Sequence, residues 1–188
     1  MSKDRLVAFT DAVIAIIITI LILELEKPSQ MTWSAIWDLR MNFFAYTISF
    51  FWIGTMWVNM HRAWDSIDKI NNNLVWISML LLFFSSFFPY TTSIVANHFN
   101  SSVAQTLYGL VVLAVSFCNV WMYNELEKVT SQNDVQLMAR KHNSRMKVDI
   151  TIKLIGLLLA LTIFPAAMMW AVLITAIFII LPRSIQTR

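Results

Sequence analysis

The stretch RLVAFTDAVIAIIITILILELEKP, residues 5–28, places an arginine and an aspartate at one end of a run that is otherwise almost entirely apolar. A helix needs about 20 predominantly apolar residues to cross a bilayer, and this run is long enough. Charged side chains inside such a segment are rare, and they tend to mark function or a buried polar network. The stretch therefore predicts a transmembrane helix with Arg5 and Asp11 near one end.

The composition of the whole chain agrees with a membrane protein. Of its 188 residues, 58% are hydrophobic and only 13% are charged, whereas soluble domains have about 45–50% apolar and 25% charged residues. The net charge of +3 is too small to suggest a nucleic-acid partner. One cysteine allows no intrachain disulfide, and the first apolar run continues into Glu24 and Glu26 without the small residues of a signal-peptide cleavage site.

Further apolar runs follow along the chain, and they predict an all-α, polytopic protein with one six-helix transmembrane domain over residues 1–188. Pro89 lies inside the third run and should kink or end that helix. Asp149 and Lys153 have the spacing of a local ion pair on a helix. The expected spans are residues 4–25, 37–60, 74–96, 103–123, 148–164 and 166–181.

The basic residues predict the orientation of these spans. If the N-terminus is cytosolic, the outer loops hold only Lys27 and Arg40, which is the imbalance that the positive-inside rule describes. Both termini should then face the cytosol, and the run RKHNSRMK, residues 140–147, should meet anionic lipid headgroups. The cytosolic set is Lys3, Arg5, Arg62, Lys69, Lys128, Arg140, Lys141, Arg145, Lys147, Arg183 and Arg188.

The first span carries an apolar stripe. At about 100° per residue, Ile16, Ile20 and Leu23 fall within roughly 60° of one another, and Thr19 lies at the edge of the same face. Ordinary packing or lipid contact would produce the same pattern, because every span here is rich in isoleucine and leucine. Periodicity alone therefore leaves the role of the stripe open.

The two charges of the first span face different ways. Arg5, like Phe9, projects onto the stripe, whereas Asp11 lies on nearly the opposite side and should point into the protein. Their separation of six residues does not suit an intrahelical pair, so each needs a partner elsewhere. Candidate partners for Asp11 at the inner end of the second span are His61, Asn59 and Trp57.

A sequence motif adds a resemblance to a known family. The pattern R-x-x-x-F-T-D at Arg5, Phe9, Thr10 and Asp11 resembles the R-x-x-x-F-S-D signature that opens the first helix of the endolysosomal potassium channels of the transmembrane protein 175 type. Thr10 replaces the serine and keeps its hydroxyl. The segment NLVWISMLLLFFSSFFPYTTS, residues 73–93, also resembles that family, and six spans correspond to its bacterial single-repeat members.

The resemblance implies a homotetramer in a bacterial plasma membrane whose first helices line a central pore. By position, Ile16 would form the hydrophobic constriction, Thr19 the hydroxyl layer beside it, and Leu23 an outer apolar ring with Ile20 on the same face. Glu24 and Glu26 would attract cations at the outer mouth. A network of Arg5, Phe9, Thr10, Asp11 and His61 would brace the helix.

The expected function is that of a potassium-permeable channel that conducts K⁺ without a TVGYG filter, a cofactor or a bound metal. A poorly selective or proton-permeable cation channel is the nearest alternative, and a non-conducting membrane scaffold is a further one. A lipid-modifying enzyme would need clustered acid–base or metal groups at one depth, and the three scattered histidines and the single Cys118 do not supply them.

Overall fold

The computed structural model describes residues 2–185, and the side chains of residues 2–177. Within that part of the chain all regular structure is helical, which confirms the all-α prediction. Arg183 and Arg188, predicted on the cytosolic side, lie outside the described side chains. The helices are α1 (Lys3–Leu23), α2 (Trp33–Asp38), α3 (Arg40–Asp65), α4 (Asn72–Ser85), α5 (Phe88–Asn97), α6 (Ser102–Val129), α7 (Asn133–Thr162) and α8 (Ala167–Ile185).

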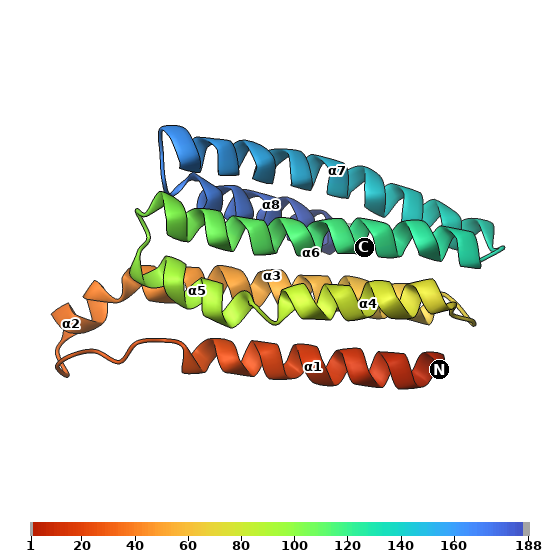
Figure 1. Ribbon diagram of the computed structural model, residues 1–188, viewed down its shortest axis with the longest axis horizontal. Coiled ribbons are helices and arrows are strands. Elements are labelled where there is room, and N and C mark those ends of the chain that lie inside the picture. Colours follow the sequence, from red (N-terminus) through yellow and green to blue (C-terminus); the bar gives the residue numbers. More distant parts are fainter. Residues whose placement is uncertain (1, 186–188) are drawn as a thin grey trace.

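The long helices run along one common axis (Figure 1). The helix α1 forms one side of the bundle, α3 and the α4–α5 segment form the middle, and α6, α7 and α8 form the other side. The inner face of α6 supplies much of the core with Tyr108, Val112, Met122 and Leu126, all of them buried. Gly156 allows α7 and α8 to approach closely, because a Cβ atom there would lie 2.5 Å from the Cβ of Ala171.

Helix boundaries follow local chemistry. The side chains of Asn71 and Ser101 accept hydrogen bonds from the first turns of α4 and α6, as N-capping residues do. The third predicted span is broken: α4 ends at Ser85 and α5 begins at Phe88, with Pro89 in its first turn. This confirms the expected effect of Pro89, whose ring cannot continue a preceding helix but fits the start of a new one.

Two regions differ from the sequence-based expectation. The second predicted span, residues 37–60, begins inside a separate short helix, α2, and its main helix α3 starts at Arg40 and runs on to Asp65. The polar segment before the fifth span is itself helical, because α6 continues to Val129 and α7 begins already at Asn133. At 1.5 Å per residue, the 30 residues of α7 measure about 45 Å, which exceeds the roughly 30 Å of a hydrocarbon core.

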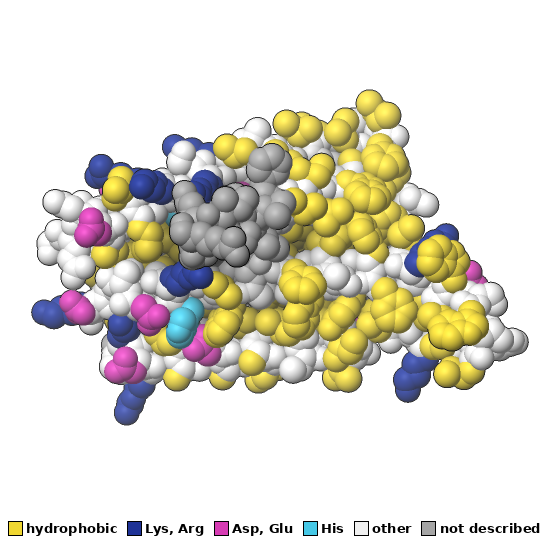
Figure 2. All heavy atoms as spheres, turned by 180° about the vertical axis from the view of Figure 1, so that it is seen from behind, with side chains coloured by type: hydrophobic (Ala, Val, Ile, Leu, Met, Phe, Trp, Pro, Cys, Tyr) yellow, Lys and Arg dark blue, Asp and Glu magenta, His cyan; other side chains and the backbone are white. Residues whose placement is uncertain are grey.

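Among the described residues, three helical stretches are long and apolar enough to cross a membrane: Lys3–Leu23, Asn72–Asn97 and Ser102–Val129. The other long helices contain more polar residues or, like Ala167–Ile177, offer a shorter apolar stretch. Figure 2 shows hydrophobic side chains spread over the middle of one face, with most charged side chains gathered at the end that holds the N-terminus. The count of six spans remains a prediction.

Candidate functional site

The two faces of α1 have opposite surroundings. One face is buried against α3, α4 and α5, with Leu6, Thr10, Ile14, Ile17 and Leu21 each at most 3% exposed. The centre of that face lies about 120° around the helix from the predicted stripe. The helix is therefore anchored to its own chain by one face only.

The predicted stripe is the exposed face. Ile16 is 57% exposed and Leu23 78% exposed, and Ile20 and Phe9 are exposed as well. Exposed apolar residues that form a continuous row mark contact with lipid, with another protein or with a ligand path. No part of the chain that the structure describes covers the stripe, which is therefore open to lipid or to another chain.

Thr19 is the polar member of this face. Its hydroxyl donates a hydrogen bond to the backbone carbonyl of Ile16 at 2.8 Å. The proton of the hydroxyl is thus used within the helix, and the oxygen lone pairs remain available on the exposed side. Such an oxygen can accept a hydrogen bond or contact a cation.

Asp11 contacts one of its three candidate partners. The indole Nε1 of Trp57 on α3 donates a hydrogen bond of 2.7 Å to Asp11 Oδ1. His61 is one step removed, because its ring stacks on Trp57 and its Nε2 lies 3.6 Å from Asp65 Oδ2. The backbone carbonyl of Asn59 accepts a hydrogen bond from the Tyr123 hydroxyl on α6. The structure therefore brings Asp11, Trp57 and His61 into one chain of contacts between α1 and α3.

The other motif residues divide between the two faces of α1. Thr10 is buried, and its hydroxyl donates to the carbonyl of Val7 at 2.8 Å. Arg5 is exposed, and its side chain forms no hydrogen bond or ion pair with the described residues. A contact that the sequence did not suggest fastens this end of the helix: Lys3 Nζ donates to the carbonyl of Ile67 at 2.7 Å.

The predicted outer-mouth residues follow the end of α1. The helix ends at Leu23, Glu24 is its C-cap, and Glu26 lies in the loop beyond. Both carboxylates are exposed. They lie at the end of α1 remote from Arg5 and Asp11, so the helix carries its charged groups at the two ends and an apolar row between them.

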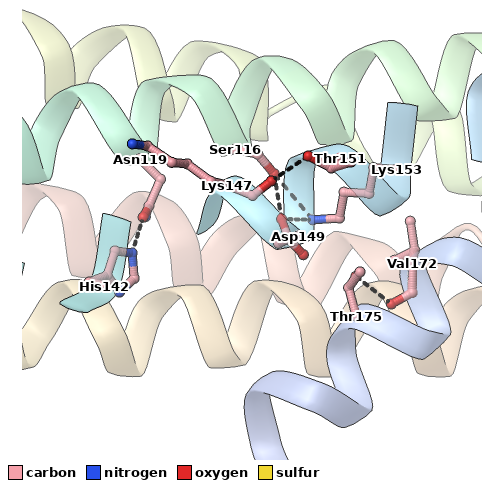
Figure 3. Close-up of polar contacts among 9 residues, drawn as sticks. All are labelled: Ser116, Asn119, His142, Lys147, Asp149, Thr151, Lys153, Val172 and Thr175. Carbon is pink, nitrogen blue, oxygen red and sulfur yellow. Dashed lines mark hydrogen bonds and ion pairs between the residues drawn. The ribbon is translucent and has the colours of Figure 1, made fainter. Parts of the chain in front are cut away.

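A second polar group lies inside the opposite half of the bundle (Figure 3). Lys153 Nζ lies 2.6 Å from Asp149 Oδ2 and also donates to Ser116 at 3.2 Å. The prediction of a local Asp149–Lys153 pair is confirmed. The sequence did not predict its depth, for Lys153 is 0% and Asp149 3% exposed. A lysine between Ile152 and Leu154 in an apolar run was the available signal.

The pair is enclosed by several helices. Lys153 Nζ also lies 4.9 Å from the ring centre of Trp52 on α3, a cation–π distance. A cavity of about 30 Å³ between α3, α6 and α7 is lined by Asp149, Lys153 and Asn119, among others. Asn119 Oδ1 lies 2.7 Å from His142 Nε2. Among the described residues, no group of three or more His, Cys, Asp and Glu side chains could hold a metal ion.

Comparison with known proteins links this geometry to a family. The model of the family described as "Endosomal/lysosomal potassium channel TMEM175" matches residues 5–89, from the motif arginine to Pro89. A potassium channel of Chryseobacterium sp. (strain P1-3) is 38% identical over 119 residues, which cover 62% of this chain and 62% of that relative. The chain thus spans a little under two thirds of that relative's length.

Two further comparisons cover more of the chain. A potassium channel of Chamaesiphon minutus is 31% identical over 158 residues, covering 79% of this chain and 75% of that protein. The crystal structure of a lysosomal potassium-selective channel TMEM175 homolog from Chamaesiphon minutus has the same fold, with a TM-score of 0.75, 24% identity, and coverage of 96% of this chain and 97% of that one. From the sequence match over most of a relative's length, we conclude that this chain belongs to the TMEM175 family.

Proposed function

We propose that the protein is a potassium-permeable cation channel in which the α1 helices of a homotetramer line a central pore. The observation that carries the proposal is the division of α1 into one face buried in its own chain and one uncovered apolar face with Ile16 and Leu23. Convergence of several copies would enclose these side chains. The relatives in Chryseobacterium and Chamaesiphon are named as potassium channels, which agrees with this reading.

The constriction in this proposal consists of side chains. A helix satisfies its own backbone hydrogen bonds, so its wall presents hydrocarbon to the pore. A narrow apolar ring stops ions by dewetting and passes them when it widens. Ile16 forms the ring, Ile20 and Leu23 continue it toward the outside, and the Thr19 oxygen offers cations a polar contact.

The charged ends of α1 have separate roles in the proposal. Glu24 and Glu26 repeat in every subunit and raise the local concentration of cations at the outer mouth. Asp11, held by Trp57 at 2.7 Å, keeps the rotation of α1 about its axis constant relative to α3. That rotation determines which side chains face the pore.

The proposed setting is the plasma membrane of a bacterium, with six spans and both termini in the cytosol. The basic residues support this orientation, because most Lys and Arg side chains on the face drawn in Figure 2 lie at the end that holds the N-terminus. Membrane lipids and monovalent cations are then the partners of the tetramer.

Flux measurements on purified protein in liposomes test the pore assignment. We expect Ile16→Asn to increase the leak of K⁺ severalfold and to weaken discrimination against Na⁺, because an amide hydrates the apolar ring. Ile22→Asn is the matched control: Ile22 is 49% exposed on the same helix, about 120° from Ile16. Unchanged flux and selectivity in Ile16→Asn, or an equal leak in both variants, contradicts the proposal.

A poorly selective or proton-permeable pore is the second candidate, because Thr19 is the polar residue of an otherwise apolar wall. The same liposomes distinguish the two when K⁺, Na⁺ and H⁺ gradients are imposed in turn. Preferential K⁺ flux supports the first candidate, and equal or dominant Na⁺ or H⁺ flux supports the second. The mass of the protein in detergent tests the tetramer independently.

A further inference from the structure

A groove lies at the N-terminal end of the bundle, away from α1. Its volume is about 280 Å³, and it is bounded by the last turns of α3 and by the first half of α7. Tyr123 of α6 and His142 of α7 line it, and their rings stack with centroids 3.6 Å apart. In this part of the molecule α7 packs on α6 rather than on α3, which leaves room between the two walls.

Three basic side chains line the groove: Arg62 from α3, and Lys141 and Arg145 from α7. All three are exposed, and none forms a side-chain hydrogen bond or ion pair within the described part of the chain. Their basic neighbours differ, for Lys128 pairs with Glu125 at 3.1 Å and Arg140 with Glu127 at 2.6 Å. The groove therefore concentrates positive charge that the protein does not neutralise itself.

The only described acidic lining residue is Asp134, at the far end of the α7 face. It lies seven residues, or about 10 Å along the helix, from Lys141. Arg62, Lys141 and Arg145 thus outnumber the carboxylate by three to one. Two guanidinium groups and an ammonium group suit a phosphate, since arginine binds phosphate oxygens through paired N–H donors.

The depth of the groove indicates where the phosphate comes from. Arg145 lies three residues before the expected start of the fifth span, and Arg62 two residues after the expected end of the second. These offsets are about 3–5 Å along a helix, and the headgroup layer of each leaflet is about 5–8 Å thick. Both arginines therefore lie at headgroup level.

We propose that this groove binds the phosphate headgroup of an anionic phospholipid of the cytoplasmic leaflet. The assignment of the leaflet rests on the orientation under the proposed function, but binding itself does not require ion conduction. A bound headgroup bridges α7 to the inner end of α3. Five residues before Arg62, α3 carries Trp57, whose indole donates a hydrogen bond to Asp11 of α1. A single helix, α3, therefore connects the bound lipid to the candidate pore helix.

Native mass spectrometry of the purified protein in detergent tests the site. The probes are dioleoylphosphatidylglycerol, dioleoylphosphatidylcholine and inorganic phosphate, each titrated separately. We expect phosphatidylglycerol to bind at least about tenfold more tightly than phosphatidylcholine. The combined variant Arg62→Gln, Lys141→Gln and Arg145→Gln should lose about tenfold or more of that affinity, since each basic residue near a membrane surface contributes up to about fivefold.

The matched control is Lys27→Gln, Arg40→Gln and Lys69→Gln, which removes the same charge from exposed positions outside the groove. We expect its affinity to stay within about twofold of the parent, because single long-range charges are screened beyond roughly 8–10 Å. Lys141→Gln alone, with one exposed residue changed, checks that any loss does not arise from misfolding. It should lose about fivefold.

Several results would overturn the site. The first is an equal loss of affinity for phosphatidylglycerol in the control and groove variants. The second is an undiminished affinity for phosphatidylglycerol in the groove variant, and the third is inorganic phosphate that binds as tightly as the lipid. The last result identifies a site for a soluble anion. Ile16→Asn should bind the lipid like the parent, so failure of the flux test and failure of the lipid test are distinguishable.

Discussion

The helices α1 and α7 both carry charges beside apolar stretches, but the surroundings of these charges differ. On α7, the Asp149–Lys153 pair is enclosed by its own chain, with a separation of 2.6 Å and almost no exposure. On α1, the Arg5 side chain forms no hydrogen bond or ion pair with the described residues, and Ile16 is 57% exposed. The charged pair of α7 is thus held within one chain. The described part of the chain leaves the Ile16 face of α1 uncovered, as it also leaves Ile155 and Leu158 exposed on α7, so lipid or further copies must cover the apolar faces of both helices.

This difference indicates which polar and apolar groups hold the chain together and which are available for assembly. A buried pair whose two charges meet within one chain serves first as a link between helices, here between α6, α7 and α3 through Ser116 and Trp52. An apolar face without cover is an open contact that assembly can use. Variants of the two helices should therefore differ in kind: those of α7 should change the stability of the chain, and those of α1 should change assembly and flux.

The largest effect is expected from Lys153→Met. This variant leaves the Asp149 carboxylate buried without its cation, and breaking such a pair costs about 3–5 kcal/mol. The midpoint temperature of thermal unfolding in detergent should fall by roughly 10 °C. The double variant Asp149→Leu with Lys153→Met should recover most of the loss, because it buries no charge. A single variant as stable as the parent would show that the pair does not hold α7 in place.

A smaller effect is expected from Asp11→Ala. Loss of the hydrogen bond from Trp57 removes about 1–2 kcal/mol from the contact between α1 and α3, so the fraction of tetramer and the flux should fall while the chain remains folded. Asp11→Asn should be milder, because its amide oxygen still accepts the indole N–H. Asp4→Ala is the control on the same helix. Normal assembly and flux of Asp11→Ala would refute the bracing role.

The smallest effect is expected at the end of α1. Replacing Glu24 and Glu26 by glutamine should reduce K⁺ flux about twofold at low ionic strength, since these exposed carboxylates act only by attracting cations. At roughly 1 M salt the Debye length is about 3 Å, and parent and variant should conduct equally. A reduction that persists in high salt would mean that the carboxylates contact the permeating ion directly.

Much of the fold follows from local patterns. The helical class, the break at Pro89 and the Asp149–Lys153 pair depend on spacing, ring geometry and chain length, and the structure confirms them. For Asp11, local reasoning narrowed the partners to a short set at the inner end of the second span but did not choose among them. The choice of Trp57 depends on how α1 and α3 are rotated against each other, across 46 residues of chain.

The groove that we assign to lipid could not be located from sequence. The sequence shows its basic residues only as part of an uneven charge distribution. In the folded chain Arg140 forms an ion pair with Glu127 and Lys128 with Glu125, whereas the basic residues of the groove form none with the described residues. The packing of the helices therefore decides which basic side chains remain without an acidic partner. The helical continuation of α6 and α7 past the expected spans, which builds one wall, also required the contacts between those two helices.

The sequence by itself determined that this chain is helical and suited to a membrane, and that its first helix has a continuous apolar stripe. These properties follow from composition and from the fixed angle per residue of a helix. Only the tertiary structure decided that the stripe is uncovered, that Lys153 is fully enclosed and that Arg62, Lys141 and Arg145 share a groove. Burial and pairing depend on neighbours far apart in sequence, and no local pattern encodes which of them meet.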